Sequence, residues 1–405
     1  MDTVITRKIA DNLFLIRTID RKLKYFEALW EVPEGMVYNA YLLKTSEGAV
    51  LFDTTKANYT EPFLEALRVL IDPKEIKHLV VHHMEPDHSG AMPAVLETIG
   101  EHVQVWGHPF AKRLIKSLYG LAPIFQTVKD DTILEIGGKK LTFRQMPWLH
   151  WPECMITYIP EDGFLFGGDI FGSYGIPEGI FDNDGDDLHE FLHLAREYFA
   201  SVIGHYKSYV NKNLLKLEGE AAAPKMILPA HGLLWRENPS QIMDAYTNWA
   251  NGTPEKGKVV IVYSSMYGFI EKSVQVVIDD LEKRGFNPEI LRITDEHRDD
   301  LVDILGQIPD SEAVIIATAT YEAGIFPLMA YIIDEILHKV AYEKPMLLLS
   351  TFGWGGMANK QLKPKLEESS FHLVDVIEIK GLLDDESREN ILAGVSKLVD
   401  AIQSP

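Results

Sequence analysis

The segment HHMEPDH at residues 82–88 holds the densest group of metal-ligating side chains in the sequence, with His83, Glu85, Asp87 and His88 directly after the apolar run HLVV. We expect that run to be a strand. Residues 83, 85 and 87 can converge from a loop at its end, and they supply one imidazole and two carboxylates. This donor set suits iron or manganese at least as well as zinc. His82 is left out, because alternate side chains of a strand point to opposite faces.

Three further candidates occupy comparable places, because His150, Asp169 and His231 each follow an apolar run that predicts a strand. Ligands gathered from several strand ends are how an α/β scaffold assembles a site from distant parts of the sequence. Seven candidate ligands exceed the needs of one ion. The sequence therefore predicts two metals, roughly 3.5–4 Å apart and bridged by a carboxylate. Asp169 is the predicted bridge.

Three loops toward the C-terminus have the composition of a flavin site. SSMYGF (264–269) follows the run KVVIVY and leads into a predicted helix, whose first backbone N–H groups can bind a phosphate. ATATYEAG (317–324) and STFGWGG (350–356) follow two later runs, at the ends where open α/β sheets bind ligands. Tyr321 and Trp354 offer flat faces for an isoalloxazine ring. The candidate flavin-binding residues are Ser264, Ser265, Met266, Tyr267, Gly268, Phe269, Ala317, Thr318, Ala319, Thr320, Tyr321, Thr351, Phe352, Gly353, Trp354, Gly355 and Gly356. FMN is favoured over FAD because no G-x-G-x-x-G fingerprint opens this region.

A competing metal motif is HEFLH at residues 189–193, in which His189, Glu190 and His193 match the helix pattern of zinc proteases. The extended form of that pattern places a third histidine where this chain has Phe199. The missing histidine counts against the zinc-protease interpretation, which is kept only as an alternative. In that case Glu190→Gln would abolish activity.

The elements that must position these residues change in character along the chain. Up to residue 250, short apolar runs bounded by Gly, Pro and Asp alternate irregularly with helical patterns, which indicates a sheet-rich α/β sandwich. Residues 251–257 are polar and rich in turn formers, so we predict a linker there. From 258 to 405, five apolar runs alternate with amphipathic helices, which predicts a doubly wound, five-stranded parallel sheet.

The composition excludes several classes of protein. The net charge of −21 disfavours binding of nucleic acid or of an anionic membrane through a general field. The sole cysteine, Cys154, excludes an internal disulfide and any cysteine-ligated rubredoxin or iron–sulfur centre in these 405 residues. No signal peptide and no run of about 18 apolar residues is present, so we expect a cytoplasmic protein without a membrane partner.

The pattern H-x-E-x-D-H, followed by His150, Asp169 and His231, resembles the metallo-β-lactamase superfamily, whose hydrolases usually have histidine where this chain has Glu85. That exchange, together with the flavin loops, resembles the flavodiiron proteins over essentially the whole chain, and most of all the deazaflavin-dependent oxidases of methanogenic archaea. The resemblance implies a metallo-β-lactamase-like αββα sandwich followed by a flavodoxin-like FMN domain. It also implies an oxidoreductase that reduces dioxygen to water, or alternatively nitric oxide to nitrous oxide.

The resemblance further implies the division of the ligands. One iron would be held by His83, Glu85 and His150, and the other by Asp87, His88 and His231, with Asp169 bridging the two. The histidine equivalent to His88 is a ligand in some family members and turned away in others, so its role stays open. Four residues are candidates to line a dry pocket at the irons, with packing in the core as the alternative: Trp151 and Pro152 after His150, and Tyr25 and Phe26 near the N-terminus.

The partners follow from the same resemblance. Electrons would come from an external donor, either reduced deazaflavin coenzyme or rubredoxin, and a head-to-tail homodimer would bring the flavin of one subunit to the irons of the other. Two other classes of function stay open on the residues alone. These are a binuclear zinc hydrolase, and a flavodoxin-type electron carrier whose N-terminal half has only a structural role.

Overall fold

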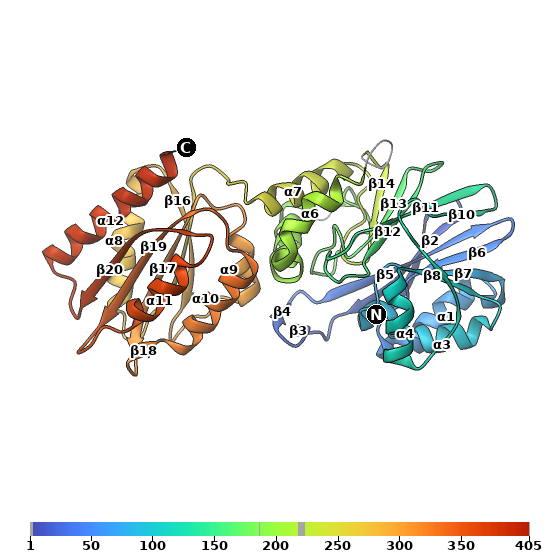
Figure 1. The fold of residues 1–405 in the computed structure, drawn as a ribbon, viewed down its shortest axis with the longest axis horizontal. Helices are drawn as coiled ribbons and strands as arrows, with labels where there is room; N and C mark the ends of the chain where they lie inside the picture. The colour runs from blue at the N-terminus through green and yellow to red at the C-terminus, as the bar shows by residue number, and fades with distance from the viewer. Residues whose placement is uncertain (1–2, 186, 218–222, 405) are drawn as a thin grey trace. The chain divides into compact units, whose positions relative to one another are not determined.

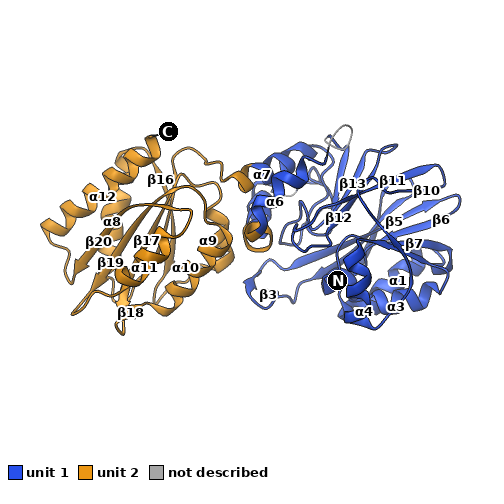
Figure 2. Cartoon of the chain, in the orientation of Figure 1, with its two compact units in different colours: residues 1–199, 206–247 blue, residues 200–205, 248–405 orange. Residues whose placement is uncertain are grey.

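The computed structural model describes residues 3–185, 187–217 and 223–404, which divide into two compact units (Figures 1 and 2). Unit 1 comprises residues 1–199 and 206–247, and unit 2 comprises residues 200–205 and 248–405. The helix α7 (Pro239–Asn251) runs across the division, and the first strand of unit 2 begins at Lys258.

Unit 1 contains two sheets. The larger has the strand order β1-β2-β5-β6-β7-β8-β9, and its strands are β1 (Val4–Ala10), β2 (Leu13–Asp20), β5 (Met36–Thr45), β6 (Gly48–Phe52), β7 (Ile76–Val81), β8 (Gln104–Gly107) and β9 (Ile124–Thr127). The smaller has the order β10-β11-β12-β13-β14, and its strands are β10 (Ile133–Ile136), β11 (Lys139–Gln145), β12 (Met155–Ile159), β13 (Phe164–Gly168) and β14 (Met226–Pro229). A separate hairpin pairs β3 (Tyr25–Phe26) with β4 (Trp30–Glu31).

The helices of unit 1 are α1 (Thr60–Leu70), α2 (Pro86–Ser89), α3 (Met92–Ile99), α4 (Pro109–Tyr119), α5 (Leu188–Tyr198) and α6 (Lys207–Leu214). The inner faces of the two sheets share one apolar core, to which Leu15 and Phe52 contribute from the larger sheet and Phe143 and Phe166 from the smaller. The outer face of the larger sheet packs on α1, α3 and α4. Strands that are apolar on both faces are therefore buried between a helical layer and a second sheet.

Unit 2 is one sheet of parallel strands in the order β16-β15-β17-β19-β20, with the short strand β18 antiparallel to β17. The strands are β15 (Lys258–Ser264), β16 (Asn287–Ile293), β17 (Ala313–Tyr321), β18 (Gly324–Ile325), β19 (Pro345–Phe352) and β20 (His372–Lys380). The helices are α8 (Phe269–Lys283), α9 (Leu301–Gln307), α10 (Pro327–Lys339), α11 (Ala358–Glu367) and α12 (Asp385–Gln403). α8 and α12 pack on one face of the sheet, and Figure 1 shows α9 and α10 on the other.

The amphipathic pattern of α8 explains its place. Ile270, Val274, Val277 and Leu281 recur every three or four residues and are all buried, so one stripe of the helix faces the sheet. Coverage of both faces also explains why the central strands β15, β17 and β19 are buried along most of their length.

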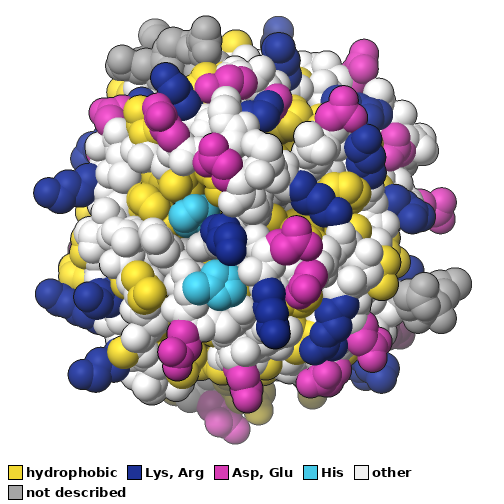
Figure 3. Space-filling model, turned by 90° about the vertical axis from the view of Figure 1, so that its right-hand side faces the viewer, with side chains coloured by type: hydrophobic (Ala, Val, Ile, Leu, Met, Phe, Trp, Pro, Cys, Tyr) yellow, Lys and Arg dark blue, Asp and Glu magenta, His cyan; other side chains and the backbone are white. Residues whose placement is uncertain are grey.

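Charged residues of both signs share the molecular surface. On the face drawn in Figure 3, Lys and Arg side chains are interspersed with Asp and Glu. The net charge of −21 therefore does not produce a uniformly negative surface on that side. Among the described residues, no helix combines the length and the apolar character that a membrane span requires.

Candidate functional site

The first group of ligand-type side chains joins residues from distant parts of unit 1. His83 and Glu85 follow β7, His150 lies beyond the end of β11, and Asp169 comes directly after β13. One donor atom from each of the four lies within 4.8 Å of the others, and all four side chains are buried. Glu85 Oε2 is 3.2 Å from His83 Nε2 and 3.1 Å from His150 Nε2. The loops after these strands thus place four donors around one point.

The second group consists of Asp87 and His88, which lie in α2, and His231, which follows β14. The Nε2 atoms of the two histidines are only 3.2 Å apart. Among the described residues, neither carboxylate oxygen of Asp87 has a hydrogen-bond partner, although the side chain is buried and lies 3.3 Å from His88 Nε2 and 3.5 Å from His231 Nε2. A buried carboxylate without hydrogen bonds is costly unless a cation compensates it. The donors present therefore fit a bound metal ion.

Asp169 connects the two groups through its two carboxylate oxygens. Oδ2 is 3.2 Å from His150 Nε2, in the first group. Oδ1 is 2.7 Å from His88 Nε2 and 3.3 Å from His231 Nε2, in the second. One oxygen facing each group is the arrangement that a bridge between two ions requires. All seven predicted ligands thus lie in two adjoining clusters.

The backbone at Asp169 explains how its side chain reaches that position. Gly168 ends β13 with φ +58°, a left-handed conformation that glycine adopts without steric cost. The turn redirects the chain at the strand end, where Asp169 begins the next segment. The His231 ring is fixed differently, because its Nδ1 donates to the Val37 carbonyl over 2.9 Å.

Without metal, the charges of the two groups compensate one another. Burial lowers the pKa of His88 and of His150, but the neighbouring carboxylates outweigh burial and raise these pKa values to about 9 and about 10. Burial raises the pKa of Asp169, but His88 and His83 hold it well below its usual range. Asp87 differs, because burial dominates and raises its pKa. The metal-free site therefore holds protonated imidazoles beside ionised carboxylates at neutral pH.

A pH dependence of metal loading follows. Metal binding must release the protons of His88 and His150, whose raised pKa values of about 9 and 10 keep both rings charged at pH 7. Since each proton released contributes a factor of ten per pH unit, the apparent affinity for ferrous ion is expected to rise by about 100-fold or more per unit from pH 6 to pH 8. Anaerobic competition with a chelator measures this rise, and an affinity that does not change over this range would contradict it.

The surroundings of the two groups are aromatic. The Trp151 ring lies 4.8 Å from the His83 ring, edge to face. The predicted role of Tyr25 does not agree with its position, because this side chain is 53% exposed. The adjacent Phe26 is buried instead, with its ring 6.3 Å from that of His231. Successive side chains of the β3–β4 hairpin point to opposite faces, so only one of the two can face the site.

Three buried residues near the site were not among the predicted ones. Tyr198 and Tyr38 place their rings 5.5 and 5.6 Å from that of His231. Glu153 accepts hydrogen bonds at Oε1 from His83 Nδ1, at 2.9 Å, and from the Met84 N–H, at 3.1 Å. An isolated carboxylate or tyrosine has no characteristic spacing in a sequence, so nothing pointed to these three residues in advance. The only sequence signal for Glu153 is its place three residues after His150.

The residues set aside in the sequence lie elsewhere. His82 contacts Asp53 through Nδ1 at 2.6 Å and Thr157 through Nε2 at 2.8 Å, so it points away from His83 as expected. In α5, His189 and Glu190 are exposed, and no described cluster brings His189 and His193 together. The HEFLH segment therefore does not form the site of a zinc protease within the described residues.

A pocket of about 390 Å3 in unit 2 is lined by the loops proposed for the flavin. The predicted residues that line it are Met266, Tyr267, Phe269, Ala319, Thr320, Tyr321, Thr351, Phe352, Gly353 and Trp354. Glu322 and Gly381 also line it and were not predicted. Thr320 Oγ1 accepts hydrogen bonds from the N–H groups of Met357 and Ala358, which fixes the loop after β19 against β17.

Seven predicted flavin residues do not line this pocket. They are Ser264, Ser265, Gly268, Ala317, Thr318, Gly355 and Gly356. For two of them the reason is that β17 extends to Tyr321, so Ala317 and Thr318 lie inside the sheet and not in a loop. There the Thr318 hydroxyl hydrogen-bonds that of Ser264, over 2.9 Å. Ser265 and Gly268 line a neighbouring hollow of about 350 Å3, together with Arg292.

The indole of Trp354 is 95% exposed and makes no contribution to the packed core. Trp354→Ala is therefore expected to weaken FMN binding about tenfold, through lost aromatic stacking, while leaving thermal unfolding of the flavin-free protein unchanged. Fluorescence titration with FMN measures the affinity. Val69→Ala, at another strongly exposed apolar position, is the control and should leave it unchanged. An unaltered FMN affinity in Trp354→Ala would exclude this side chain from the flavin site.

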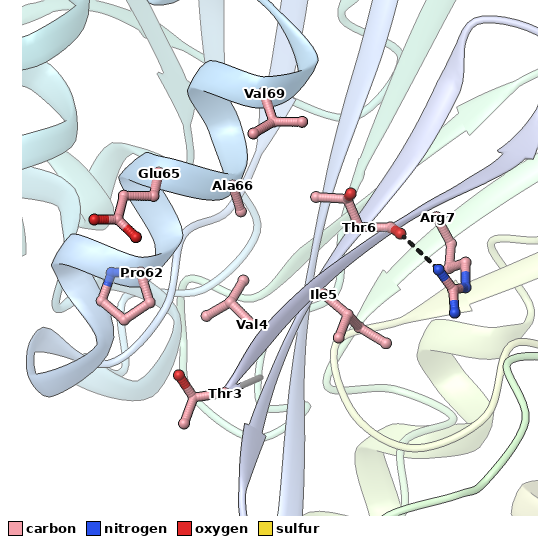
Figure 4. A pocket seen from close by; sticks show the side chains of 9 residues that line it. All are labelled: Thr3, Val4, Ile5, Thr6, Arg7, Pro62, Glu65, Ala66 and Val69. Carbon is pink, nitrogen blue, oxygen red and sulfur yellow. Dashed lines mark hydrogen bonds between the residues drawn. The ribbon is translucent and has the colours of Figure 1, made fainter. Parts of the chain in front are cut away.

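A further hollow, of about 650 Å3, lies between β1 and α1 (Figure 4). Its only charged side chains are Arg7 and Glu65, and it contains no histidine. Arg7 donates to the neighbouring Thr6 carbonyl over 3.4 Å. This groove lacks the donors that metal or flavin binding requires.

Two family profiles match separate parts of the chain. The family profile described as ODP family beta lactamase matches residues 36–232, and the profile for flavodoxin matches residues 261–392. A nitric oxide reductase from Moorella thermoacetica is 31% identical over 369 residues, which cover 90% of each chain. The solved structure of a mutant of the flavo di-iron protein from Thermotoga maritima is 41% identical over 100% of both chains, with a TM-score of 0.93.

The chain belongs to the flavodiiron protein family. It is an oxidoreductase, and its cofactors are FMN and two iron ions. The predicted fold, a metallo-β-lactamase-like sandwich followed by a flavodoxin-like parallel sheet, is confirmed. A second relative, the rubredoxin-oxygen oxidoreductase of Megalodesulfovibrio gigas, is 30% identical over 370 residues that cover 90% of each chain.

Proposed function

We propose that this flavodiiron protein receives electrons at FMN and uses them at its di-iron centre to reduce dioxygen to water. The position of Asp169, with one oxygen toward each ligand group, carries the proposal. His83, Glu85 and His150 would hold one iron, and Asp87, His88 and His231 the other, with Asp169 between them. When bound, the two irons supply electrons to a diatomic substrate.

The three carboxylates in this set favour iron over zinc and stabilise its ferric state. The protein's own contribution is to hold the ligands and to keep the site dry. The Trp151, Tyr38 and Tyr198 rings pack around the histidines and exclude water. Burial and the nearby Asp169 raise the pKa of Tyr198 well above its ordinary value. Its phenol therefore stays protonated at neutral pH.

At the flavin pocket, the chain supplies flat surfaces and backbone groups. Tyr321, at the end of β17, and Trp354, in the loop after β19, line one pocket, so both can contact an isoalloxazine ring. The phosphate would bind at the N-terminal end of α8, where Tyr267 and Gly268 have φ +66° and +76° and turn the chain into the helix. We propose a head-to-tail homodimer, in which the flavin of one subunit serves the irons of the other.

Two donors are proposed. Reduced deazaflavin coenzyme follows from the resemblance to the oxidases of methanogens. Rubredoxin is supported by the name of the M. gigas relative, a rubredoxin-oxygen oxidoreductase. Cys154 is the only cysteine of the 405 residues, so these residues cannot form a rubredoxin centre themselves.

Reduction of nitric oxide to nitrous oxide is the second candidate function. It is favoured by the relative from M. thermoacetica, which is named a nitric oxide reductase. A binuclear zinc hydrolase is a remote alternative, because the first group contains the carboxylate of Glu85 at the position where the hydrolases of the superfamily usually have a neutral histidine.

The experiment measures, by electrode, the consumption of dioxygen and, in separate anaerobic assays, that of nitric oxide, with protein that carries iron and FMN. Reduced deazaflavin coenzyme and reduced rubredoxin are tested as donors. Faster turnover of dioxygen supports the water-forming oxidase, and faster loss of nitric oxide supports the reductase. Absence of turnover with every pair, despite full iron and FMN, would contradict both.

A further inference from the structure

The Glu153 carboxylate lies directly behind one of the candidate iron ligands. Its Oε1 is 2.9 Å from His83 Nδ1 and also accepts the Met84 N–H, at 3.1 Å. Glu153 is buried, with 1% of the residue exposed. Among the described residues, its Oε2 has no hydrogen-bond partner, whereas Oε1 accepts from two N–H groups, which favours the ionised carboxylate. Glu153 therefore places a negative charge in a low-dielectric position beside the His83 ring.

The orientation of the His83 ring follows from its two nitrogens. Nε2 lies 3.2 Å from Glu85 Oε2 and 3.5 Å from Asp169 Oδ2, so this nitrogen faces the centre of the first ligand group. Nδ1 then carries the proton and donates it to Glu153. A histidine ligand that donates to a carboxylate is fixed in one tautomer and becomes a more basic ligand.

The second ligand group has no equivalent of Glu153. His231 Nδ1 donates to the Val37 carbonyl, which is a neutral acceptor. His88 Nδ1 has no hydrogen-bond partner among the described residues. The two groups thus contain similar kinds of ligand. Only in the first group does a histidine donate a hydrogen bond to a carboxylate that is not itself a ligand.

We infer that Glu153 is a positioning residue that makes the two irons unequal, lowering the reduction potential of the iron bound through His83. The iron bound by Asp87, His88 and His231 therefore accepts an electron first. This inference rests on the proposed ligand assignment. The physical cause is that a more basic ligand stabilises the more highly charged ferric ion. Outer partners of this kind change metal affinity by about 10- to 100-fold, which for a one-electron couple corresponds to roughly 60–120 mV.

The test is a redox titration of the full chain, loaded with iron and FMN, in which the two irons are followed by electron paramagnetic resonance. Glu153→Gln removes the charge but keeps the size, and its amide oxygen can still accept both N–H groups. We expect one iron potential to rise by roughly 60–120 mV and the other to move by less than a third of that. One of the two irons should also dissociate about 10- to 100-fold faster into a chelator.

Two further variants separate charge from structure. Asp53→Asn alters a second buried carboxylate–histidine pair, with His82, which is not a candidate ligand, and should shift neither potential. Glu153→Asp keeps the charge and should leave the iron potentials closer to those of the wild type than Glu153→Gln does. Equal shifts of both irons in Glu153→Gln, no shift, or the same shift in Asp53→Asn would each overturn the inference.

The wild-type protein gives a test that needs no variant. Its two irons should titrate in separate steps at least about 60 mV apart, and a single unresolved step would overturn the inference. The proposed function fails independently, if the wild type does not bind two irons or does not turn over a diatomic substrate. Normal iron content and turnover, with potentials insensitive to Glu153, would refute only the role of this residue.

Discussion

Asp169→Asn is expected to remove iron from the chain and to lower turnover at least about 1000-fold. The reason is the position of its two oxygens, 3.2 Å from His150 Nε2 and 2.7 Å from His88 Nε2, which makes this one carboxylate a donor to both ligand groups. An amide has no charge to separate two cations, and only its oxygen can ligate. Iron and FMN per chain are measured together with turnover.

The flavin provides an internal control, because its pocket is built from residues of unit 2 and should keep FMN in this variant. Asp162→Asn is the matched control at the opposite end of β13, since Asp162 pairs with Lys139 at 2.6 Å and belongs to neither ligand group. It should retain iron and activity. Full iron content in Asp169→Asn would show that this residue is not the bridge.

Glu85→His is expected to change which metal the site selects. Glu85 Oε2 lies within 3.2 Å of both His83 Nε2 and His150 Nε2, so it contributes the only carboxylate that belongs to the first group alone. An imidazole in its place leaves a softer, less charged donor set that suits zinc. We expect zinc to replace much of the iron in protein isolated from cells, and turnover to fall by at least about 100-fold.

Metal analysis of the isolated protein and electrode measurements of turnover check this result. Glu101→His introduces the same side chain at an exposed position and should change neither the metal nor the rate. A Glu85→His variant with wild-type iron content and rate would mean that Glu85 does not select the metal.

The clustering of the seven candidate ligands could be predicted from the sequence for a physical reason. Four of these ligands lie within six residues after a single strand, and the other three each follow a further strand of the same domain. Strand ends along one side of a sandwich converge in space, so the places of these residues after the strands predict that their side chains lie close together. The fold was accessible for a similar reason, because the regular alternation of apolar runs and amphipathic helices in unit 2 permits few arrangements.

Other features depended on information that spacing does not contain. The length of β17 was underestimated, because Ala317 and Thr318 can end a strand or continue it with equal ease. Tyr25 and Phe26 are equally suited to line a pocket, and only the pleat of the hairpin decides that Phe26 is the buried one. Glu153 is recognisable only once His83 lies beside it in the fold.

The most direct test is a rapid-mixing experiment with fully reduced protein, in which reoxidation of FMN is followed after addition of nitric oxide or dioxygen. In the wild type, both the irons and FMN should be reoxidised, with water or nitrous oxide as the product. In Asp169→Asn, FMN should remain reduced after mixing with nitric oxide. Equally fast reoxidation of FMN in the two proteins would show that electrons reach the substrate without the di-iron centre.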